Sequence, residues 1–325
     1  MTNKASMIFI HAQTSLHPGS GTATGAIDLP VQRERHTDWP LIPGSTLKGV
    51  LRDHFRGVVA RANPEKDLIW ADRDAELEHL FGPSMKGRDE EAKRGSNAAD
   101  FAGALAVTDA RILLFPVRSL AGLFAWVTCP AALDRLRRDA QLATEKFAIP
   151  KDIPELKNNA ALISSSCELL VQDRNMVLEE FDFTAQECQG LKELVDELSR
   201  QLSLDRLKTR LAVISDDMFT HFVKNATEVN ARIALDYKTK TVSNGALFYV
   251  ETLPPETVFY SLLIADNSKG KRDKDVKPVV SAMQNDQEVV SYVGNLLKTS
   301  PILQIGGEAS TGKGICQVTM CGGGK

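Results

Sequence analysis

The spacing of apolar residues predicts strands and helices that are mixed along the whole chain. Residues 7–12 and 257–265 are short apolar runs, and residues 103–130 alternate apolar with polar positions, which is typical of strands. Helical periodicity recurs in the segments 44–62, 133–143, 186–202 and 286–297. A further helix is expected to start near Ser215. Because strands pair antiparallel between these helices, the pattern predicts an α+β fold.

Long polar segments interrupt this pattern. Residues 17–44 are dense in Gly, Thr and Pro, and a loop of this length in a compact domain is usually functional. Residues 82–103 are expected to form a mobile loop, residues 144–175 an irregular segment, and residues 267–278 a charged loop. Near the end of the chain, residues 301–320 are predicted to form a strand, a loop and a last strand.

Residues 229–255 are predicted to form a long β-hairpin. They are rich in Val, Ile, Thr, Tyr and Phe, and Asn244-Gly245 is a strong turn signal. Tyr237, Lys238 and Lys240 lie near the expected tip. Because this tip is too polar to pack in a core, the hairpin is expected to project from the domain as an arm.

The first long helix carries a row of basic residues. Ser45 or Thr46 can cap its start, and Lys48, Arg52 and Arg56 recur on one face. Such a row is usually a solvated helix surface. The first of these residues, however, lies in the first turn, where the helix dipole disfavours a cation, and this favours an anion bound at the helix start.

The stretch GGEASTGKG at residues 306–314 is almost a phosphate-binding P-loop. Gly314 stands where a P-loop has the Ser or Thr that binds Mg²⁺. The β-branched segment that follows predicts a strand, whereas a P-loop opens a helix, so an ATPase is disfavoured. The glycines, with Lys313 among them, predict a loop that a foreign backbone can approach closely and whose amides can bind an anion.

Composition restricts the class of protein further. The 325 residues are 43% hydrophobic and 25% charged, as in an ordinary globular protein, and the net charge of −3 gives no global signal of nucleic-acid binding. Any such site must therefore be a local basic patch. The 5 cysteines are scattered without a CxxC pair, which argues against zinc or a disulfide framework and fits a reducing cytoplasm. Neither a signal peptide nor a membrane span is expected.

The long first loop contains the candidates for chemistry. Asp28 lies inside it, His17 opens it, and Glu251 follows a distant apolar strand. A carboxylate can hold a divalent metal, and a histidine can act as an acid or a base. Spacing alone favours a turn-capping role for Asp28 and leaves the role of His17 open. Asp38 and Glu34 are weaker candidates.

Several stretches together carry a resemblance to a known family. They are residues 17–55, 107–130, 214–236, 245–263 and 303–318, the last with the glycine-rich loop. Through them the chain resembles, from end to end, the RAMP superfamily of CRISPR effector proteins. More narrowly, it is similar to the repeating backbone subunit of type III-B (Cmr) complexes, which act in antiviral defence.

The resemblance implies a single RAMP domain over residues 1–325. This domain would comprise a modified RRM-like palm of ferredoxin type, an inserted helical, lid-like region at 144–215 and a hairpin thumb at 229–255. Copies would stack as a helical filament on a guide crRNA, beside other Cmr subunits and without a membrane. Target RNA would pair with the guide, each thumb would displace a base, and cleavage would follow beside each displaced base.

The resemblance also implies roles for particular residues. Asp28 matches the family's catalytic position and would hold a divalent metal, Mg²⁺ or Mn²⁺, while His17 and Glu251 would assist in catalysis. RNA contacts are expected from Ser45, Thr46, Lys48, Arg52, Gly306, Gly307, Gly312, Lys313 and Gly314. The thumb would present Tyr237, Lys238 and Lys240. Two alternatives stay open, a non-catalytic RNA-binding filament subunit and a nuclease that processes guide RNA.

Overall fold

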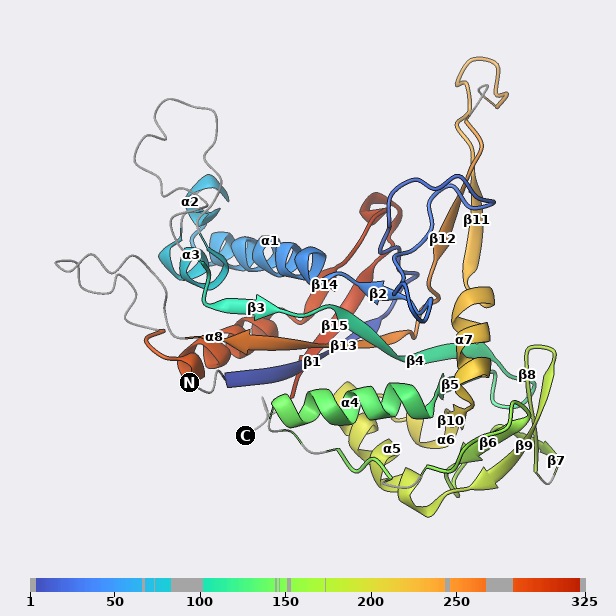
Figure 1. The fold of residues 1–325 in the computed structure, drawn as a ribbon. Coiled ribbons are helices and arrows are strands. Elements are labelled where there is room, and N and C mark those ends of the chain that lie inside the picture. The colour runs from blue at the N-terminus through green and yellow to red at the C-terminus, as the bar shows by residue number, and fades with distance from the viewer. Residues whose placement is uncertain are drawn as a thin grey trace.

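The computed structural model describes residues 4–65, 68–72, 74–82, 102–143, 145, 147–150, 153–172, 174–242, 246–266 and 283–321. Most of the expected mobile loop 82–103 and the whole charged loop 267–278 lie outside these residues, as does Asn244-Gly245. Strands and helices are mixed along the described chain, so the predicted α+β class is confirmed (Figure 1). None of the described helices is long and apolar enough to cross a membrane.

Most of the longer strands and helices follow the apolar spacing of the sequence. The strands are β1 (Lys4–Ala12), β2 (Leu41–Ile42), β3 (Leu105–Val107), β4 (Ala110–Arg118), β5 (Phe124–Thr128), β6 (Ala160–Ile163), β7 (Leu170–Gln172), β8 (Asn175–Leu178), β9 (Phe181–Glu187), β10 (Leu211–Ile214), β11 (Glu228–Arg232), β12 (Phe248–Thr252), β13 (Val258–Ala265), β14 (Ile302–Gln304) and β15 (Ile315–Met320). The helices are α1 (Gly44–Ala62), α2 (Leu68–Asp72), α3 (Ala75–Phe81), α4 (Pro130–Leu142), α5 (Gln189–Leu202), α6 (Leu207–Arg210), α7 (Asp216–Asn225) and α8 (Asp286–Thr299), with a 3₁₀ turn at Ala309–Thr311.

A mixed sheet of 13 strands forms the centre of the molecule, and its main path runs β14-β15-β1-β13-β4-β5-β10-β6-β9-β8-β7. β1 lies between β15 and β13 and pairs antiparallel with both. Its neighbouring residues Ile8 and Phe9 point to opposite faces, and both are fully buried. The sheet therefore has an apolar core on each side.

Different helices cover the two faces of β1. Ile8 belongs to one apolar cluster with Phe55 of α1 and Val293 of α8. Phe9 belongs to a second cluster with Leu136 of α4, and α5 contributes to this cluster as well. Since the clusters lie on opposite sides of β1, α1 and α8 cover one face of the sheet, and α4 and α5 cover the other.

The inserted region 144–215 contains strands as well as helices. β10 pairs parallel with β5, with Leu211 opposite Trp126, and β6 to β9 extend the sheet beyond it. The region is therefore not wholly helical, and the expectation of an irregular segment at 144–175 is wrong for β6 and β7. Strands of 4 and 3 residues offer too few alternating positions for the pattern to be recognised in the sequence.

Within residues 229–255, β11 and β12 form a separate antiparallel sheet that projects from the domain (Figure 1). The structure describes a turn at residues 236–241, where the sequence placed the polar tip, whereas the Asn244-Gly245 signal lies outside the described residues. Asp236 N donates to Thr241 O and Lys240 N donates to Asp236 O, both at 2.9 Å, and Lys240 has a positive φ of 58°. Asp236 Oδ1 also accepts from the amide of Lys238, so an aspartate organises this turn.

Helix α1 does not begin as the sequence suggests. Pro43 occupies the N-cap, so Ser45 and Thr46 are exposed residues of the first turn and the prediction that one of them caps the helix is wrong. Gly44 N instead donates to Asp109 Oδ1 (2.7 Å). Because Asp109 lies 65 positions further along the chain, directly before β4, local sequence cannot reveal this cap.

Candidate active site

The long loop 17–44 is bound to the hairpin strand β12 by backbone hydrogen bonds. Leu29 N donates to Tyr249 O, and Glu251 N donates to Leu29 O, both at 3.0 Å. This pairing places Asp28 beside the strand, where its Oδ2 accepts from Tyr249 N (2.7 Å). The half-exposed Asp28 carboxylate therefore has a fixed position next to the hairpin, although a loop carries it.

His17 is buried against the same strand in a defined tautomer. Its Nδ1 lies 2.6 Å from the backbone oxygen of Glu251. Since a carbonyl oxygen only accepts, Nδ1 carries the proton, and in the neutral ring Nε2 keeps its lone pair. A side chain on Gly19 would place its Cβ 2.7 Å from this Nε2. Glycine at position 19 therefore keeps the nitrogen accessible.

Glu251 has a buried carboxylate that other groups already occupy. Its Oε2 accepts from Val31 N (2.9 Å), and its Oε1 accepts from Arg33 Nη2 (2.5 Å). The residue is only 3% exposed. Sequence reasoning missed Arg33, because nothing in the local pattern links it to a strand that follows about 200 residues later. The geometry favours a positioning role for Glu251 over the direct catalytic role that the sequence suggested.

The glycine-rich loop 306–314 packs directly against His17. Gly307 N donates to His17 O (2.9 Å). Gly306 has a φ of +81°, and a Cβ there would lie 2.3 Å from the same oxygen. Only glycine fits both the backbone angle and this close approach. The structure thus brings together two segments that the sequence places at opposite ends of the chain.

The glycine-rich loop also contacts the chain before His17 and the hairpin strand β11. Gly314 N donates to Ser15 O (2.8 Å), just before His17. Glu308 forms an ion pair with Arg232 of β11 (2.8 Å). Gly312 has a φ of +77° with open space around it, and the Lys313 side chain is partly exposed beside it. This end of the loop therefore remains accessible to a ligand.

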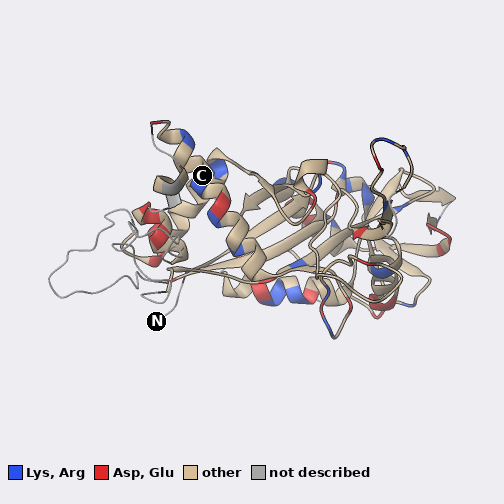
Figure 2. Cartoon of the chain, turned by 90° about the horizontal axis from the view of Figure 1, so that it is seen from above, with Lys and Arg blue, Asp and Glu red and all other residues tan. Residues whose placement is uncertain are grey.

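The basic row of α1 is partly buried. Burial lowers the pKa of Lys48, and the neighbouring charge of Arg52 lowers it further. Arg56 forms an ion pair with Asp53 on the same helix. In Figure 2, Lys and Arg positions are spread over many elements and interleaved with Asp and Glu, which agrees with the small net charge. An anion beside Lys48 would stabilise the charged ammonium and raise its pKa again, which offsets the effects of burial and of Arg52.

The hairpin presents both its polar tip and apolar side chains to solvent. Tyr237 is 75% exposed, and Lys238 Nζ lies 5.6 Å from the centre of its ring. The sequence interpretation considered the polar tip and missed the exposed apolar side chains. These are Val229, Ile233, Leu235, Val242, Leu247, Phe248 and Tyr249.

The two weaker carboxylate candidates are engaged elsewhere. Asp38 pairs with Lys224 (2.7 Å), and Glu34 pairs with Arg135 (2.8 Å). Among the residues that the structure describes, no group of three or more His, Cys, Asp or Glu side chains could hold a metal ion. The half-exposed Asp28 carboxylate, by contrast, is held by the backbone amide of Tyr249.

Comparison with known proteins agrees with this architecture. A curated relative from Pyrococcus furiosus, named CRISPR system Cmr endoribonuclease Cmr4, is 36% identical over 322 residues, or 98% of this chain and 96% of the relative. The crystal structure of oligomeric Cmr4 from Pyrococcus furiosus superposes with a TM-score of 0.67 at 32% identity, covering 98% of both chains. A chain of the type III-B Cmr-beta cryo-EM structure bound to cognate target RNA superposes with a TM-score of 0.68, covering 98% of each chain. At 20% identity this match shows likeness of fold alone.

The family itself follows from two independent matches. The model of the RAMP superfamily matches residues 9–317, which is nearly the whole chain. The 36% identity to a Cmr4 protein over 98% of the chain then identifies the subgroup within this superfamily. The chain belongs to the RAMP superfamily and, within it, to the Cmr4 proteins of CRISPR systems.

Proposed function

We propose that this chain is the repeating backbone subunit of a type III-B CRISPR complex, that it binds guide crRNA and that it cleaves complementary target RNA at regular intervals. One observation carries the proposal: loop 17–44, the hairpin strand β12 and the glycine-rich loop meet at His17 and Asp28. The relative from Pyrococcus furiosus is named an endoribonuclease, and the similar crystal structure is described as oligomeric.

The geometry suits RNA cleavage by attack of a 2′-hydroxyl. This reaction needs a base for the hydroxyl proton and an alignment of the hydroxyl with the phosphate. In its neutral form His17 offers Nε2 as the base, because Glu251 O fixes the proton on Nδ1. Gly19 leaves room for a substrate group beside this nitrogen. Asp28, fixed by Tyr249 N, lies on the same strand pairing and can position the attacking group.

The Asp28 carboxylate is also a suitable ligand for a divalent metal ion, either Mg²⁺ or Mn²⁺. Mg²⁺ usually keeps several waters and is bound by one or two carboxylates together with substrate phosphates, so no cluster of acidic side chains is needed. Asp28 would hold the ion together with RNA phosphate oxygens, whereas both oxygens of Glu251 are already occupied. Such an ion supplies charge stabilisation at the phosphate and the leaving oxygen.

The strand order supports a ferredoxin-type palm. β1 and β4 run parallel with α1 between them in the chain and β13 between them in the sheet. β13 and β15 likewise run parallel, with α8 between them in the chain and β1 between them in the sheet. These are two interlocked split βαβ units, the arrangement of ferredoxin-like folds. The projecting hairpin of β11 and β12 is then the thumb.

The test is reconstitution of the full chain with guide RNA and its Cmr partner subunits. Labelled complementary RNA is added with Mg²⁺ or Mn²⁺, and in parallel with excess chelator. We expect a ladder of evenly spaced fragments that the chelator suppresses. Target binding without any cleavage would support the non-catalytic filament subunit instead. Cutting of precursor guide RNA alone would support the processing nuclease.

A further inference from the structure

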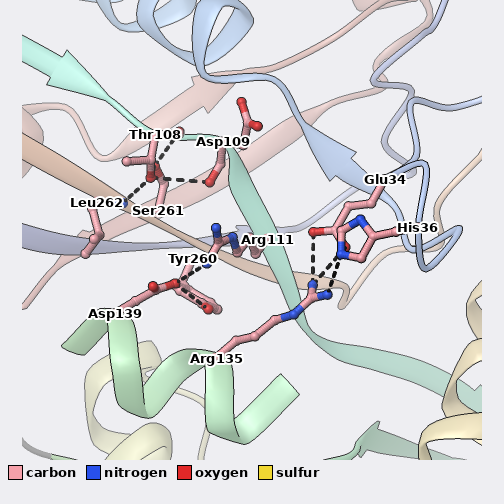
Figure 3. A network of polar contacts seen from close by, with 10 residues as sticks. All are labelled: Glu34, His36, Thr108, Asp109, Arg111, Arg135, Asp139, Tyr260, Ser261 and Leu262. Carbon is pink, nitrogen blue, oxygen red and sulfur yellow. Dashed lines mark hydrogen bonds and ion pairs between the residues drawn. The ribbon is translucent and has the colours of Figure 1, made fainter. Parts of the chain in front are cut away.

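A second polar site lies where loop 17–44 faces β4 and α4. It is a surface cavity of about 500 Å³ between this loop, β4 and α4 (Figure 3). The charged side chains that line it are Glu34, His36, Arg111, Arg135, Arg138 and Asp139. Three guanidinium groups against two carboxylates make the cavity locally positive on a chain whose net charge is −3.

The carboxylates of this cavity already have partners within the chain. Arg135 Nη1 donates to both oxygens of Glu34, at 3.0 and 2.8 Å. Asp139 Oδ2 accepts from Arg111 Nη1 (2.7 Å) and from the hydroxyl of Tyr260 (2.9 Å). Figure 3 shows these contacts converging from loop, strand and helix. The acidic groups therefore orient the arginines, and they leave the cavity with hydrogen-bond donors to spare.

The spare donors belong to three side chains. His36 Nε2 lies 3.2 Å from Arg135 Nη2 and 3.7 Å from Glu34 Oε2. Because a guanidinium only donates, Nε2 accepts from Arg135 in the neutral ring, and Nδ1 is then the donor. The Arg111 side chain is 41% exposed and contacts Asp139 and the Tyr260 hydroxyl. A guanidinium has five N–H donors, so Arg111 keeps donors for a ligand. Arg138 is exposed at the rim of the cavity. A ligand that fits these groups must offer acceptors and negative charge.

We propose that this cavity binds a phosphate of the RNA backbone, adjacent to the segment that crosses the cleavage site. The inference rests on the proposed function. Arg33 and Glu34 are consecutive, yet Arg33 contacts Glu251 of the active site while Glu34 contacts Arg135 of the cavity. One turn of loop thus borders both sites, so RNA that reaches one passes beside the other. Guanidinium groups held by fixed partners suit phosphate recognition.

The test uses Arg138→Gln in the full chain and measures affinity for labelled single-stranded RNA across a potassium chloride series. Each phosphate contact contributes about 0.7 to the slope of log affinity against log salt for a single strand. We expect Arg138→Gln to reduce the slope by about this amount and to weaken binding at low salt. Arg138→Lys should retain most of the slope. Arg206→Gln, an exposed arginine at the start of α6, should change neither quantity.

The outcomes separate this inference from the proposed function. If the unsubstituted chain does not bind RNA, the proposed function and this inference fall together. If it binds RNA and Arg138→Gln keeps the full slope and affinity, only the cavity inference is overturned. Sedimentation velocity of the same variant then tests whether the cavity binds a negatively charged group of another copy of the chain. Weaker self-association with unchanged RNA binding would mean that the cavity takes a carboxylate from another copy of the chain.

Discussion

Arg33 donates a hydrogen bond of 2.5 Å to the buried carboxylate of Glu251, although 218 positions separate the two residues. The other nitrogen of the fork, Nη1, donates to the backbone oxygens of Asp38 (2.8 Å) and Val223 (3.0 Å). Val223 belongs to α7, which leads directly into the hairpin strand β11. One guanidinium therefore holds together the candidate catalytic loop, β12 and the base of the hairpin.

Removal of the guanidinium should destabilise the chain strongly. Arg33→Met leaves the Glu251 carboxylate buried without its charged partner, which typically costs about 3–5 kcal/mol. Glu251→Gln keeps an acceptor for Val31 N and should cost less. In the double variant the two effects should not add, with a coupling of about 0.5–3 kcal/mol in denaturant unfolding. Additive effects would show that the pair contributes no interaction of its own.

Gly19 should be essential for cleavage although it carries no functional group. In Gly19→Ala the new Cβ would lie 2.7 Å from His17 Nε2, so the ring must shift or be blocked. We expect a loss of about 100-fold or more in single-turnover cleavage, the range of a general base, with RNA binding retained. The matched control is Gly25→Ala in the same loop, where a Cβ meets open space. Equal rates for both variants would remove His17 from the mechanism.

Asp28→Asn should abolish cleavage and leave assembly intact. The amide cannot carry the charge that a divalent metal or a positioned hydroxyl requires, but it can still accept from Tyr249 N and keep the loop in place. Asp38→Asn in the same loop is the control, since the Asp38 side chain forms an ion pair with Lys224 at an exposed site. Gel analysis of target fragments gives the rate. Normal cutting by a well-assembled Asp28→Asn complex would contradict the proposed role.

Lys48 should link RNA binding to pH. Its pKa in the free chain is lowered by burial and by Arg52, and a bound phosphate would raise it again. Between these two pKa values RNA binding takes up a proton, so affinity should fall as pH rises through the alkaline range below 10.5. Lys48→Met should weaken RNA binding and remove this dependence. The same pH dependence in Lys48→Met would assign it to another group.

The hairpin tip should set the positions of the cuts without contributing to stability. Replacing residues 237–246 with Asn-Gly removes exposed side chains such as Tyr237 and keeps β11 and β12. If the hairpin displaces bases, as the proposed thumb requires, the spacing of target fragments should become irregular while the melting temperature stays unchanged. Fragments mapped at single-nucleotide resolution give the answer. An unchanged ladder would separate the hairpin from the placement of the active site.

Local sequence determined the regular elements of this protein. The apolar run at residues 7–12 correctly predicted β1. Apolar residues repeating with a period of 3.6 predicted the helices α1, α5 and α8. The four glycines within 306–314 predicted a loop, and several residues of this loop have positive φ angles. These features depend on neighbours within a few residues, which a pattern records directly. The resemblance to the RAMP superfamily rested on the same stretches and led to His17, Asp28 and Glu251 as candidates.

Only the tertiary structure decided what surrounds those candidates. The partner of Glu251 lies 218 positions away, the cap of α1 comes from Asp109, 65 positions from Gly44, and His17 meets a glycine loop near the other end of the chain. The short strands of the insertion became recognisable only through pairing with β5 and β9. Charge and hydrogen-bond partners in a core are chosen by proximity in space, and a sequence pattern records only proximity along the chain.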